Sequence, residues 1–261
     1  MNLNDLSTQL LFTTVPLWVK SPKGLATGTG FIYNVPVHGD PTKLIPLLIT
    51  NYHVVEGATE AVIELVERKG DGPVLQSRVR AQISPAVLLA ATDKKLDLAL
   101  IPLGPLLNQL EASGRPVFFR AVGPEIIPSP EVVQDLAAVE EIVFIGYPSG
   151  LRDEHNSTPL IRRGITASPV WNDFGNEPVF LIDAGVYPGS SGSPVFIMNQ
   201  GAYATKTGLN VGSRLLFLGL ITGTMLRTEG TGNAYLGLGR VVKSSAIAPA
   251  IDAFARSVQP K

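Results

Sequence analysis

The sequence predicts an all-β fold of the sandwich or barrel class. Short runs of apolar, β-branched and aromatic residues recur from residue 15 onward, and clusters of Gly, Pro, Asn and Asp separate them. This pattern is typical of antiparallel strands joined by short turns, and it does not fit alternating strands and helices. The 261-residue chain is 45% hydrophobic and only 16% charged, so it can bury a large core.

The strand-like runs form two series on either side of residues 104–140. The first series is expected at residues 17–20, 28–33, 44–50, 61–67, 78–83, 87–91 and 98–102. The second is expected at residues 141–147, 161–169, 179–182, 194–198, 215–222 and 234–242. We therefore expect two strand-rich lobes, residues 13–103 and 141–243, with residues 104–140 as the connection between them.

A few segments have helical rather than strand-like spacing. They are residues 3–12, 106–112, 131–138 and 244–257. The first predicts a short N-terminal helix with Asp5 or Ser7 as its cap. The last places Ile247, Ile251 and Phe254 on one face, which predicts that the C-terminal segment, residues 244–261, is a helix packed against the body.

Charge and composition exclude several classes of partner. The formal net charge is −1 and no basic block is present, so neither nucleic acid nor an anionic membrane is an expected partner. No run approaches the roughly 18 apolar residues of a membrane span, and the N-terminus lacks the pattern of a signal peptide. The chain contains no cysteine. We expect a cytoplasmic bacterial protein, and the sequence leaves its oligomeric state open.

The segment with the most chemical information is a turn at residues 187–196. It holds Ser191 among two glycines, two prolines and two further serines, between two strand-like runs. A serine on a tight glycine turn, surrounded by free backbone N–H groups, is what an acyl-transfer nucleophile requires. An ordinary turn between two strands has the same composition. The turn alone leaves both interpretations open.

Two residues elsewhere favour the catalytic interpretation. Of the three histidines, His38 and His155 lie in polar loops and are expected to be solvated, whereas His53 follows an apolar strand-like run. A lone histidine at a strand end is more often structural than catalytic. However, Asp97 opens another apolar run, where a buried carboxylate needs a partner, and a histidine N–H would supply one.

Histidine, aspartate and serine follow one another in the order of chymotrypsin-type triads. The blocks around them resemble the three signature blocks of trypsin-like serine proteases, with the bacterial high-temperature-requirement (Deg-type) branch most similar. These blocks are residues 50–55, 97–101 and 189–194. Four further blocks match in sequence order, at residues 28–32, 145–151, 163–167 and 182–189. The resemblance covers roughly residues 15–243, and no PDZ-like domain follows it.

The resemblance implies a fold and a set of catalytic roles. The fold is two six-stranded antiparallel β-barrels, which together form one peptidase domain over residues 1–261, with the active site between them. Ser191 is implied as the nucleophile, His53 as the general base and Asp97 as the group that orients the imidazole. The N–H groups of Gly189 and Ser191 would form the oxyanion hole. These roles imply a serine endopeptidase that acts on proteins or peptides and needs no metal or cofactor.

The resemblance also implies where the substrate side chain binds. It places the base of the P1 pocket at Gly185 and the pocket walls near Thr222, Gly223 and Gly237. None of these residues is acidic, so a basic P1 side chain would lie there unpaired, at high cost. We therefore expect cleavage after small or medium apolar P1 residues. Asp183 and Thr222 are also possible supporting contacts of the triad, although an ordinary structural role is at least as frequent for such residues.

Two other functions remain open from the sequence. The first is a latent or scaffold module with a protease fold, activated by a regulatory protein partner. Long Gly-rich loops, expected at residues 199–214 and 227–233, leave room for such control. The second is an acyl esterase, because the chemistry is shared and only the substrate differs.

Overall fold

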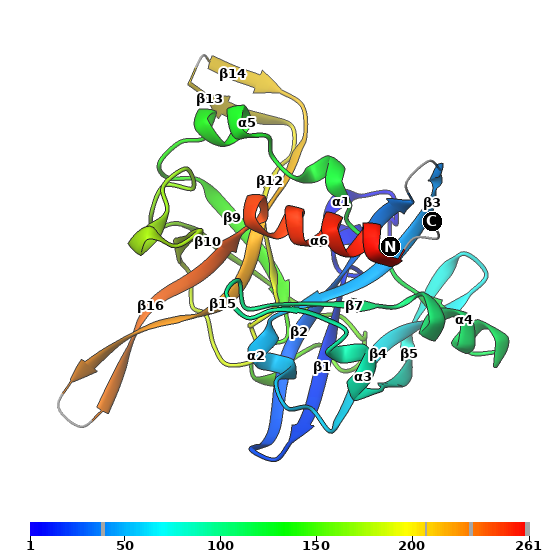
Figure 1. Ribbon diagram of the computed structural model, residues 1–261. Coiled ribbons are helices and arrows are strands. Elements are labelled where there is room, and N and C mark those ends of the chain that lie inside the picture. The colour runs from blue at the N-terminus through cyan, green and yellow to red at the C-terminus, as the bar shows by residue number, and fades with distance from the viewer. Residues whose placement is uncertain (38–39, 207, 230–231, 259–261) are drawn as a thin grey trace.

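The computed structural model describes residues 1–37, 40–206, 208–229 and 232–258. It shows a curved antiparallel sheet beside a closed barrel, with a short helix at the N-terminus and a longer one at the C-terminus (Figure 1). The expected all-β fold class is therefore confirmed. His38 lies outside the described residues, so its expected solvation stays a prediction.

The first half of the chain forms an eight-stranded sheet. Its strands are β1 (Thr14–Ser21), β2 (Gly24–Val37), β3 (Asp40–Thr50), β4 (Glu60–Lys69), β5 (Gly72–Ile83), β6 (Ala91–Asp93), β7 (Leu98–Pro102) and β8 (Val117–Phe118). They are ordered β5-β4-β1-β2-β3-β7-β6, and β8 pairs with β4. The resemblance implies six strands here; the short strands β6 and β8 raise the number to eight. We refer to these strands as the first sheet.

The second half of the chain forms a closed six-stranded barrel, as expected. Its strands are β9 (Glu141–Gly146), β10 (Leu160–Thr166), β11 (Val179–Asp183), β12 (Pro194–Asn199), β15 (Arg214–Glu229) and β16 (Gly232–Lys243). Each strand pairs with two neighbours in the closed order β10-β11-β16-β15-β12-β9. Closure removes the free edges that an open sheet would present to other chains.

Six α-helices and three 3₁₀ turns complete the described structure. They are α1 (Leu6–Leu10), α2 (Tyr52–Val55), α3 (Pro85–Leu88), α4 (Gly104–Ala112), α5 (Pro130–Asp135), α6 (Ser244–Val258), η1 (Pro124–Ile126), η2 (Pro148–Gly150) and η3 (Phe174–Asn176). Asp5 caps α1, because its carboxylate accepts a hydrogen bond from the Thr8 N–H at 2.9 Å. No helix among the described residues is both long and apolar enough to cross a membrane.

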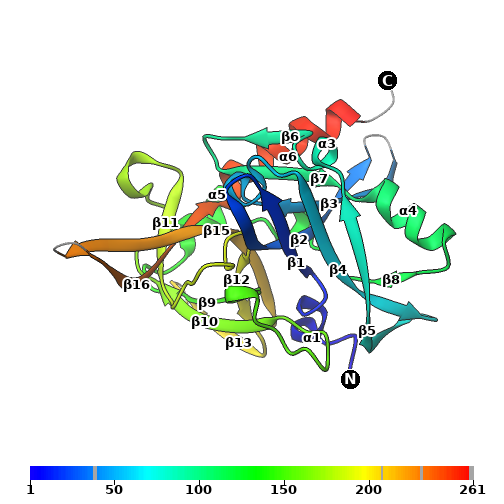
Figure 2. The ribbon, with the colours of Figure 1, turned by 90° about the horizontal axis from the view of Figure 1, so that it is seen from below.

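Three expected segments differ from the structure. Residues 87–91 were expected to be a strand, but residues 85–88 form α3, because Pro85 occupies the first turn of a helix that buries Leu88. The expected loop at residues 199–214 contains a hairpin of β13 (Ala202–Thr205) and β14 (Gly208–Val211). Around residues 227–233, β15 and β16 pair as far as Glu229 and Gly232, forming an arm that projects from the barrel (Figures 1 and 2). In both places the backbone ladder forms despite a glycine-rich composition.

Three clusters of buried side chains form the core. One lies within the first sheet and one within the barrel, and the third joins the two. In this third cluster Phe31 of β2 packs against Phe217 of β15, with ring centroids 5.2 Å apart, and α6 adds Ile247 and Ile251. Figure 2 shows the first sheet and the barrel side by side. This shared core holds the two halves of the chain together.

Candidate active site

His53, Asp97 and Ser191 meet where the first sheet borders the barrel. His53 Nδ1 lies 2.7 Å from the Asp97 Oδ2, and His53 Nε2 lies 3.0 Å from the Ser191 Oγ. An ionised carboxylate only accepts hydrogen bonds, so Nδ1 carries the imidazole proton. The lone pair of Nε2 then faces the Ser191 hydroxyl. The structure thus brings together all three residues that the sequence predicts for catalysis.

Backbone contacts fix the histidine relative to the aspartate. His53 lies in α2, directly after β3, and its own N–H donates to the Asp97 Oδ1 at 2.9 Å. The Asp97 carbonyl accepts from the Tyr52 N–H at 3.1 Å and from the Asn51 amide at 2.9 Å. Asp97 itself has a φ of 52°, a left-handed conformation that aspartate tolerates better than most residues. Both triad members of the first sheet are therefore held by the same turn.

The barrel supplies a third hydrogen bond to this carboxylate. The Thr222 hydroxyl donates to the Asp97 Oδ2 at 2.5 Å. Thr222 lies at an irregularity in the β15–β16 ladder, between Ile221 and Gly223, and such a bulge re-aims a side chain. Burial opposes ionisation of Asp97, but the hydrogen bonds from His53 and Thr222 outweigh it and lower the pKa of the carboxyl group. Thr222 therefore contacts the triad, as the sequence suggested.

The turn that carries Ser191 needs glycine at position 189. Gly189 has a φ of +87°, and a Cβ there would lie 2.6 Å from the Tyr147 carbonyl oxygen. Among the described residues, no acceptor takes a hydrogen bond from the N–H of Gly189 or of Ser191. Gly192 has a φ of +88°, and a Cβ added there would collide with the Thr29 carbonyl oxygen, so a second glycine is required. The turn thus presents two free donors beside the Ser191 hydroxyl.

Thr29 of β2 links this turn to the first sheet, and the sequence reasoning did not single it out. Its hydroxyl donates to the Gly189 carbonyl at 2.9 Å and accepts from the Tyr147 N–H at 3.0 Å. Its backbone N–H donates to the Ser191 carbonyl at 2.8 Å. The signal was present, because Thr29 lies within the block at residues 28–32 that resembles the protease family.

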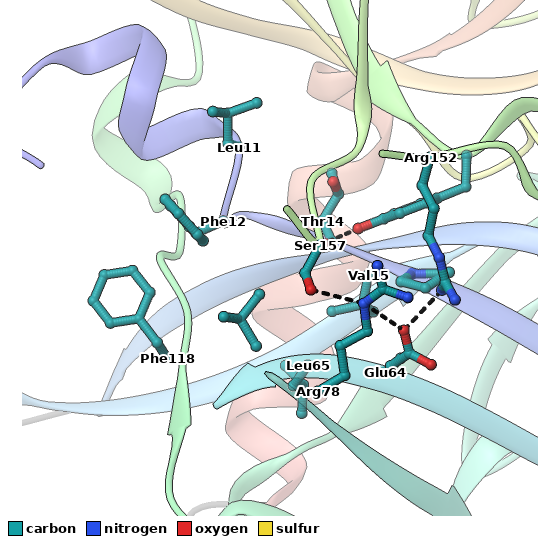
Figure 3. Close-up of a pocket in the computed structure, with 13 residues that line it drawn as sticks. Leu11, Phe12, Thr14, Val15, Glu64, Leu65, Arg78, Phe118, Arg152 and Ser157 are labelled. Atoms are coloured by element: carbon teal, nitrogen blue, oxygen red, sulfur yellow. Dashed lines mark hydrogen bonds and ion pairs between the residues drawn. The ribbon is translucent and has the colours of Figure 1, made fainter. Parts of the chain in front are cut away.

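A buried ion cluster anchors the segment that supports the turn. The Ser149 N–H donates to the Pro188 carbonyl at 2.5 Å. Three residues later in this segment, Arg152 reaches Glu64 of β4, whose side chain is only 4% exposed, with Nη1 2.8 Å from Oε1. This contact is an ion pair without the alignment of a hydrogen bond. Arg78 joins the cluster at 3.4 Å from Glu64 (Figure 3).

The same cluster also holds the end of this segment. Arg78 Nε donates to the Ser157 hydroxyl at 2.7 Å, and the Arg78 guanidinium also reaches the carbonyl of Asp153 at 3.3 Å. Beside these side chains, a cavity of about 20 Å³ separates them from Phe12 and Phe118, a space that suits a single water molecule (Figure 3). The segment at residues 147–157 is therefore tied to the first sheet at both ends.

The residues expected to bind substrate lie on β15, on β16 and in the segment that follows β11. The N–H of Ala184, next to Gly185, donates to the Gly237 carbonyl at 3.2 Å, and Gly223 pairs with Arg240 across the β15–β16 ladder. A Cβ added at Gly223 or Gly237 would meet nothing within 4 Å, so both glycines border open space. At Gly185 the situation differs, because an added Cβ would lie 2.8 Å from an arginine nitrogen of β10.

Other polar residues stay outside the site. His155 is exposed, as expected, and the Asp183 side chain is exposed without a hydrogen bond to any described residue. Asp183 therefore does not support the triad. Within the described ranges, no group of three or more His, Cys, Asp or Glu side chains is placed to hold a metal ion.

Comparisons with known proteins identify the family and the fold of this chain. A sequence profile of the trypsin-like peptidase domain matches residues 28–203, which is more than half of the chain. No curated protein matches the sequence. Among solved structures, the HtrA-type protease AlgW, with a tripeptide, is 15% identical with a TM-score of 0.54, over 95% of this chain and 62% of that one. The chain therefore spans less than two thirds of that relative.

Two further solved structures are similar over nearly the whole chain. The serine endoprotease from Yersinia pestis is 15% identical with a TM-score of 0.53, over 99% of this chain and 68% of that one. An inactive serine-to-alanine form of Rv3671c from M. tuberculosis is 16% identical with a TM-score of 0.51, over 99% of this chain and 94% of that one. At such identities these likenesses concern the fold, which is chymotrypsin-like. By its profile match, the chain belongs to the family of trypsin-like peptidase domains.

Proposed function

We propose that this chain hydrolyses peptide bonds through an acyl-enzyme formed on Ser191. The observation that carries the proposal is the continuous line of contacts from Asp97 through His53 to the Ser191 hydroxyl, at 2.7 and 3.0 Å. Both distances lie within hydrogen-bond reach, which a nucleophile and its general base require. The triad belongs to a single peptidase domain whose two lobes correspond to the first sheet and the barrel.

Acylation begins with attack of the Ser191 Oγ on the scissile carbonyl carbon. His53 Nε2 accepts the hydroxyl proton as the new C–O bond forms, and the carbonyl electron pair moves onto the oxygen. The resulting imidazolium is stabilised by the ionised Asp97, whose lowered pKa keeps it charged at neutral pH. When the tetrahedral intermediate collapses, the C–N bond breaks and Nε2 returns the proton to the leaving amine. The acyl group remains on Ser191.

Deacylation repeats these steps with water in place of serine. His53 Nε2 removes a proton from a water molecule as its oxygen attacks the ester carbonyl carbon. Collapse of the second intermediate breaks the ester C–O bond and returns the proton to the Ser191 Oγ. The carboxylic acid product leaves, and the triad is restored without a metal or cofactor.

The free N–H groups of Gly189 and Ser191 form the oxyanion hole. Support comes from their lack of acceptors among the described residues and from the packing that holds the turn in place. Donors that are oriented before the reaction stabilise developing negative charge without reorganisation, which is the largest single contribution in many enzymes. Thr29 and the segment at residues 147–157 supply that fixed orientation.

The leaving group departs on the other side of His53. A cavity of about 120 Å³ opens there, lined by His53, Val54, Glu56 and the β1–β2 hairpin around Lys23. The Lys23 ammonium and the Glu56 carboxylate form an exposed ion pair at 3.1 Å at its rim. A cavity beside the general base, lined by backbone and mixed charges, suits the part of a peptide that follows the scissile bond.

The P1 pocket lies at Gly185, Gly223 and Gly237, and it rejects basic side chains. Support comes from the absence of an acidic residue at these positions and from the presence of a guanidinium beside Gly185. Two positive charges that share a pocket repel one another, and neither finds a counterion. The preference for small or medium apolar P1 residues stays a prediction from the sequence alone, which does not place a guanidinium beside Gly185. The cytoplasmic location and bacterial origin likewise stay predictions.

Labelling with a fluorophosphonate probe tests the nucleophile. We expect the wild type to react and Ser191→Ala to be inert, since only an activated serine attacks the phosphorus centre. Ser193→Ala is the matched control: it removes a hydroxyl from the same turn, and the Ser193 Oγ makes no hydrogen bond with the described residues. Mass spectrometry of the labelled peptide identifies the modified serine.

The same experiment separates the alternatives. Failure of the wild type to react would refute the proposal and favour a latent module that a partner must activate. If the probe reacts but a peptide library is not cleaved while acyl esters are, the enzyme is an esterase. Cleavage of peptide bonds that is lost in Ser191→Ala would establish the endopeptidase.

A further inference from the structure

Arg162 occupies an unusual position in the barrel. It lies on β10 opposite Phe144 of β9, and because directly paired residues of an antiparallel ladder share a face, its side chain points toward the barrel interior. Its guanidinium carbon lies 5.8 Å from the centre of the Phe144 ring and 5.1 Å from that of Tyr187. The arginine is thus flanked by two aromatic rings at the end of the barrel that borders the Ser191 turn.

The guanidinium lies directly in front of Gly185. A Cβ built on Gly185 would be 2.8 Å from the Arg162 Nη2 and 3.3 Å from the Tyr187 hydroxyl. Any larger residue at position 185 would displace these groups. The side-chain direction of Gly185 therefore leads straight to two hydrogen-bond donors, a guanidinium and a phenol.

Arg162 differs from the other arginines around it in having no carboxylate partner. Arg163, the next residue, pairs with Glu141, and Arg240 of β16 pairs with Glu177 at 2.8 Å. Arg162 has no ion pair or hydrogen bond with any described residue. Two acidic residues lie on the neighbouring strands, each paired with Ile165 of β10: Glu141, which Arg163 engages, and Asp183.

Asp183 cannot serve as that partner in this arrangement. It pairs with Ile165 across the β10–β11 ladder. Ile165 is three residues from Arg162, and side chains alternate between the two faces of a strand, so Ile165 and Asp183 point to the face opposite Arg162. A partly buried guanidinium without a counterion is costly, and a ligand carboxylate would remove that cost.

The arginine is coupled to the nucleophile through Tyr187. The Ser190 N–H donates to the Tyr187 carbonyl at 2.9 Å, and the Tyr187 N–H donates to the Ser190 hydroxyl at 3.4 Å. These two bonds close a tight turn that leads directly into Ser191. The residue that stacks on Arg162 is therefore part of the turn that carries the reacting hydroxyl.

We propose that Arg162 is the specificity-determining residue of the P1 pocket and that this pocket selects an acidic side chain. The inference rests on the proposed function, because it assigns the substrate class of the same site. A glutamate or aspartate at P1 would enter past Gly223 and Gly237 and place its carboxylate on the Arg162 guanidinium. The planar guanidinium can donate two parallel hydrogen bonds to a carboxylate, and the Tyr187 hydroxyl supplies a third donor.

The same chemistry ranks the competing side chains. Glutamine matches glutamate in shape but lacks the charge, so it forms weaker hydrogen bonds to Arg162. An apolar P1 residue leaves the guanidinium unpaired and removes it from water. Lysine or arginine adds repulsion. The expected order of kcat/KM is therefore acidic, then amide and apolar, then basic.

A pair of peptide phosphonates that differ only in P1 glutamate or glutamine tests the proposal without turnover. Such probes modify the nucleophilic serine irreversibly, and the second-order rate constant of modification reports P1 recognition. The glutamate probe makes a charge-assisted contact with Arg162, whereas the glutamine probe makes a neutral one. We therefore expect the wild type to react at least about tenfold faster with the glutamate probe than with the glutamine probe. Peptides with P1 glutamate, glutamine, valine and lysine provide the corresponding kcat/KM values.

Variants then connect the preference to Arg162. In Arg162→Gln we expect the glutamate-to-glutamine ratio to fall to about one, whereas Arg162→Lys, which keeps the charge, retains part of it. Arg163→Gln is the matched control: it removes an adjacent charge from the opposite face and should leave the ratio unchanged. Thermal unfolding of each variant tests whether the fold is retained. If Arg162→Gln does not fold, a lowered glutamate-to-glutamine ratio in Arg162→Lys supports the proposal and an unchanged ratio contradicts it.

The outcomes separate this inference from the proposed function. Equal rates for the two probes in the wild type, or a preference for valine, would overturn the acidic specificity while leaving the peptidase intact. A glutamate preference that persists unchanged in Arg162→Gln would also overturn the role of Arg162. If neither these probes nor a fluorophosphonate modify Ser191 in the wild type, the proposed function itself fails, and the P1 assignment fails with it.

Discussion

The Thr29 hydroxyl donates a 2.9 Å hydrogen bond to the carbonyl of Gly189, across 160 residues of sequence. The same hydroxyl accepts a hydrogen bond from the Tyr147 N–H, and the carbonyl of Thr29 accepts one from the Thr50 hydroxyl at 2.8 Å. One buried threonine of the first sheet therefore holds both the turn that carries the nucleophile and the segment that supports this turn. The first sheet contributes to the geometry of the proposed oxyanion hole as well as to the triad.

Replacing this hydroxyl with a methyl group should weaken both the fold and the chemistry. Thr29→Val keeps the shape of the side chain but leaves the Gly189 carbonyl and the Tyr147 N–H without their partner. A buried group without a hydrogen bond costs about 1–3 kcal/mol, so we expect a loss of unfolding free energy of this size in urea titrations. We also expect kcat to fall, because the turn that carries the Gly189 N–H loses one of its anchors.

Thr59→Val is the control for this change. Thr59 also donates its hydroxyl to a backbone carbonyl, that of Lys20 at 3.0 Å, but the pair is exposed and makes no hydrogen bond to the triad. Water replaces the lost partner there, so stability and kcat should change little. Equal effects in the two variants would contradict a specific role for Thr29.

Gly189→Ala should abolish most of the activity. The added Cβ would lie 2.6 Å from the Tyr147 carbonyl oxygen and 2.8 Å from the Ser149 nitrogen, so the turn must move. Losing one oxyanion donor alone lowers kcat by about 10²–10³-fold. Gly201→Ala is a close control, because Gly201 has a φ of +89° and nothing within 4 Å of an added Cβ. It should lose only a modest amount of stability to backbone strain, without loss of kcat.

Asp97→Asn should lower kcat by about 10⁴-fold with little change in KM. In the wild type, the Asp97 carboxylate accepts a hydrogen bond from the protonated Nδ1 of His53. The amide nitrogen of asparagine is a donor, so it favours the tautomer in which Nδ1 carries no proton. The proton then moves to Nε2, which loses the lone pair that accepts the Ser191 proton. Steady-state kinetics on a peptide substrate measures the effect. A decrease of less than about tenfold would indicate that Asp97 does not set the histidine tautomer.

The lowered pKa of Asp97 also predicts a pH dependence of stability. The carboxyl group binds its proton less readily in the folded state than in the unfolded state, where its ordinary pKa is 3.8. Its ionisation therefore stabilises the fold above that pH, and the contribution is lost as the pH falls through the lower folded value. The difference in unfolding free energy between wild type and Asp97→Asn should be constant near neutral pH and should shrink below 3.8. A difference that does not vary with pH would contradict this.

Glu64→Gln should destabilise the protein strongly. The Glu64 side chain is 4% exposed and pairs with the guanidinium groups of Arg78, Arg80 and Arg152. The neutral amide would remove the only buried carboxylate of this cluster and leave Arg152 with the exposed Glu154 at 3.8 Å. Breaking a buried ion pair in this way costs about 3–5 kcal/mol. Urea unfolding measures the loss, and proteolysis of the 147–157 segment should become faster.

Glu60→Gln provides the comparison on the same strand. Its ion pair with Lys20 has side chains that are 53% and 58% exposed, and such surface pairs contribute less than about 1 kcal/mol. If Glu64→Gln and Glu60→Gln lose the same unfolding free energy, the buried cluster does not anchor the segment at residues 147–157.

The sequence was most informative where residues with catalytic side chains lie in characteristic blocks and those blocks follow a known order. His53, Asp97 and Ser191 could be identified because each stands in a short block of characteristic residues, and the three blocks follow one order. Local spacing likewise identified the strands, the cap of α1 and the apolar face of α6. Short apolar runs were predicted less reliably. Residues 85–88 form a helix because Pro85 starts one, and periodicity over four residues cannot distinguish a helix from a strand.

By itself, the sequence determined the fold class and the family and indicated which three residues to propose as the triad, because these depend on local patterns and their order. Only the tertiary structure decided which distant groups complete the site. Along the chain, Thr29 lies 160 residues from Gly189 and Thr222 lies 125 residues from Asp97. Arg162 lies 23 residues from Gly185. Their roles depend on closure of the barrel and on its packing against the first sheet, and no local pattern encodes those distances.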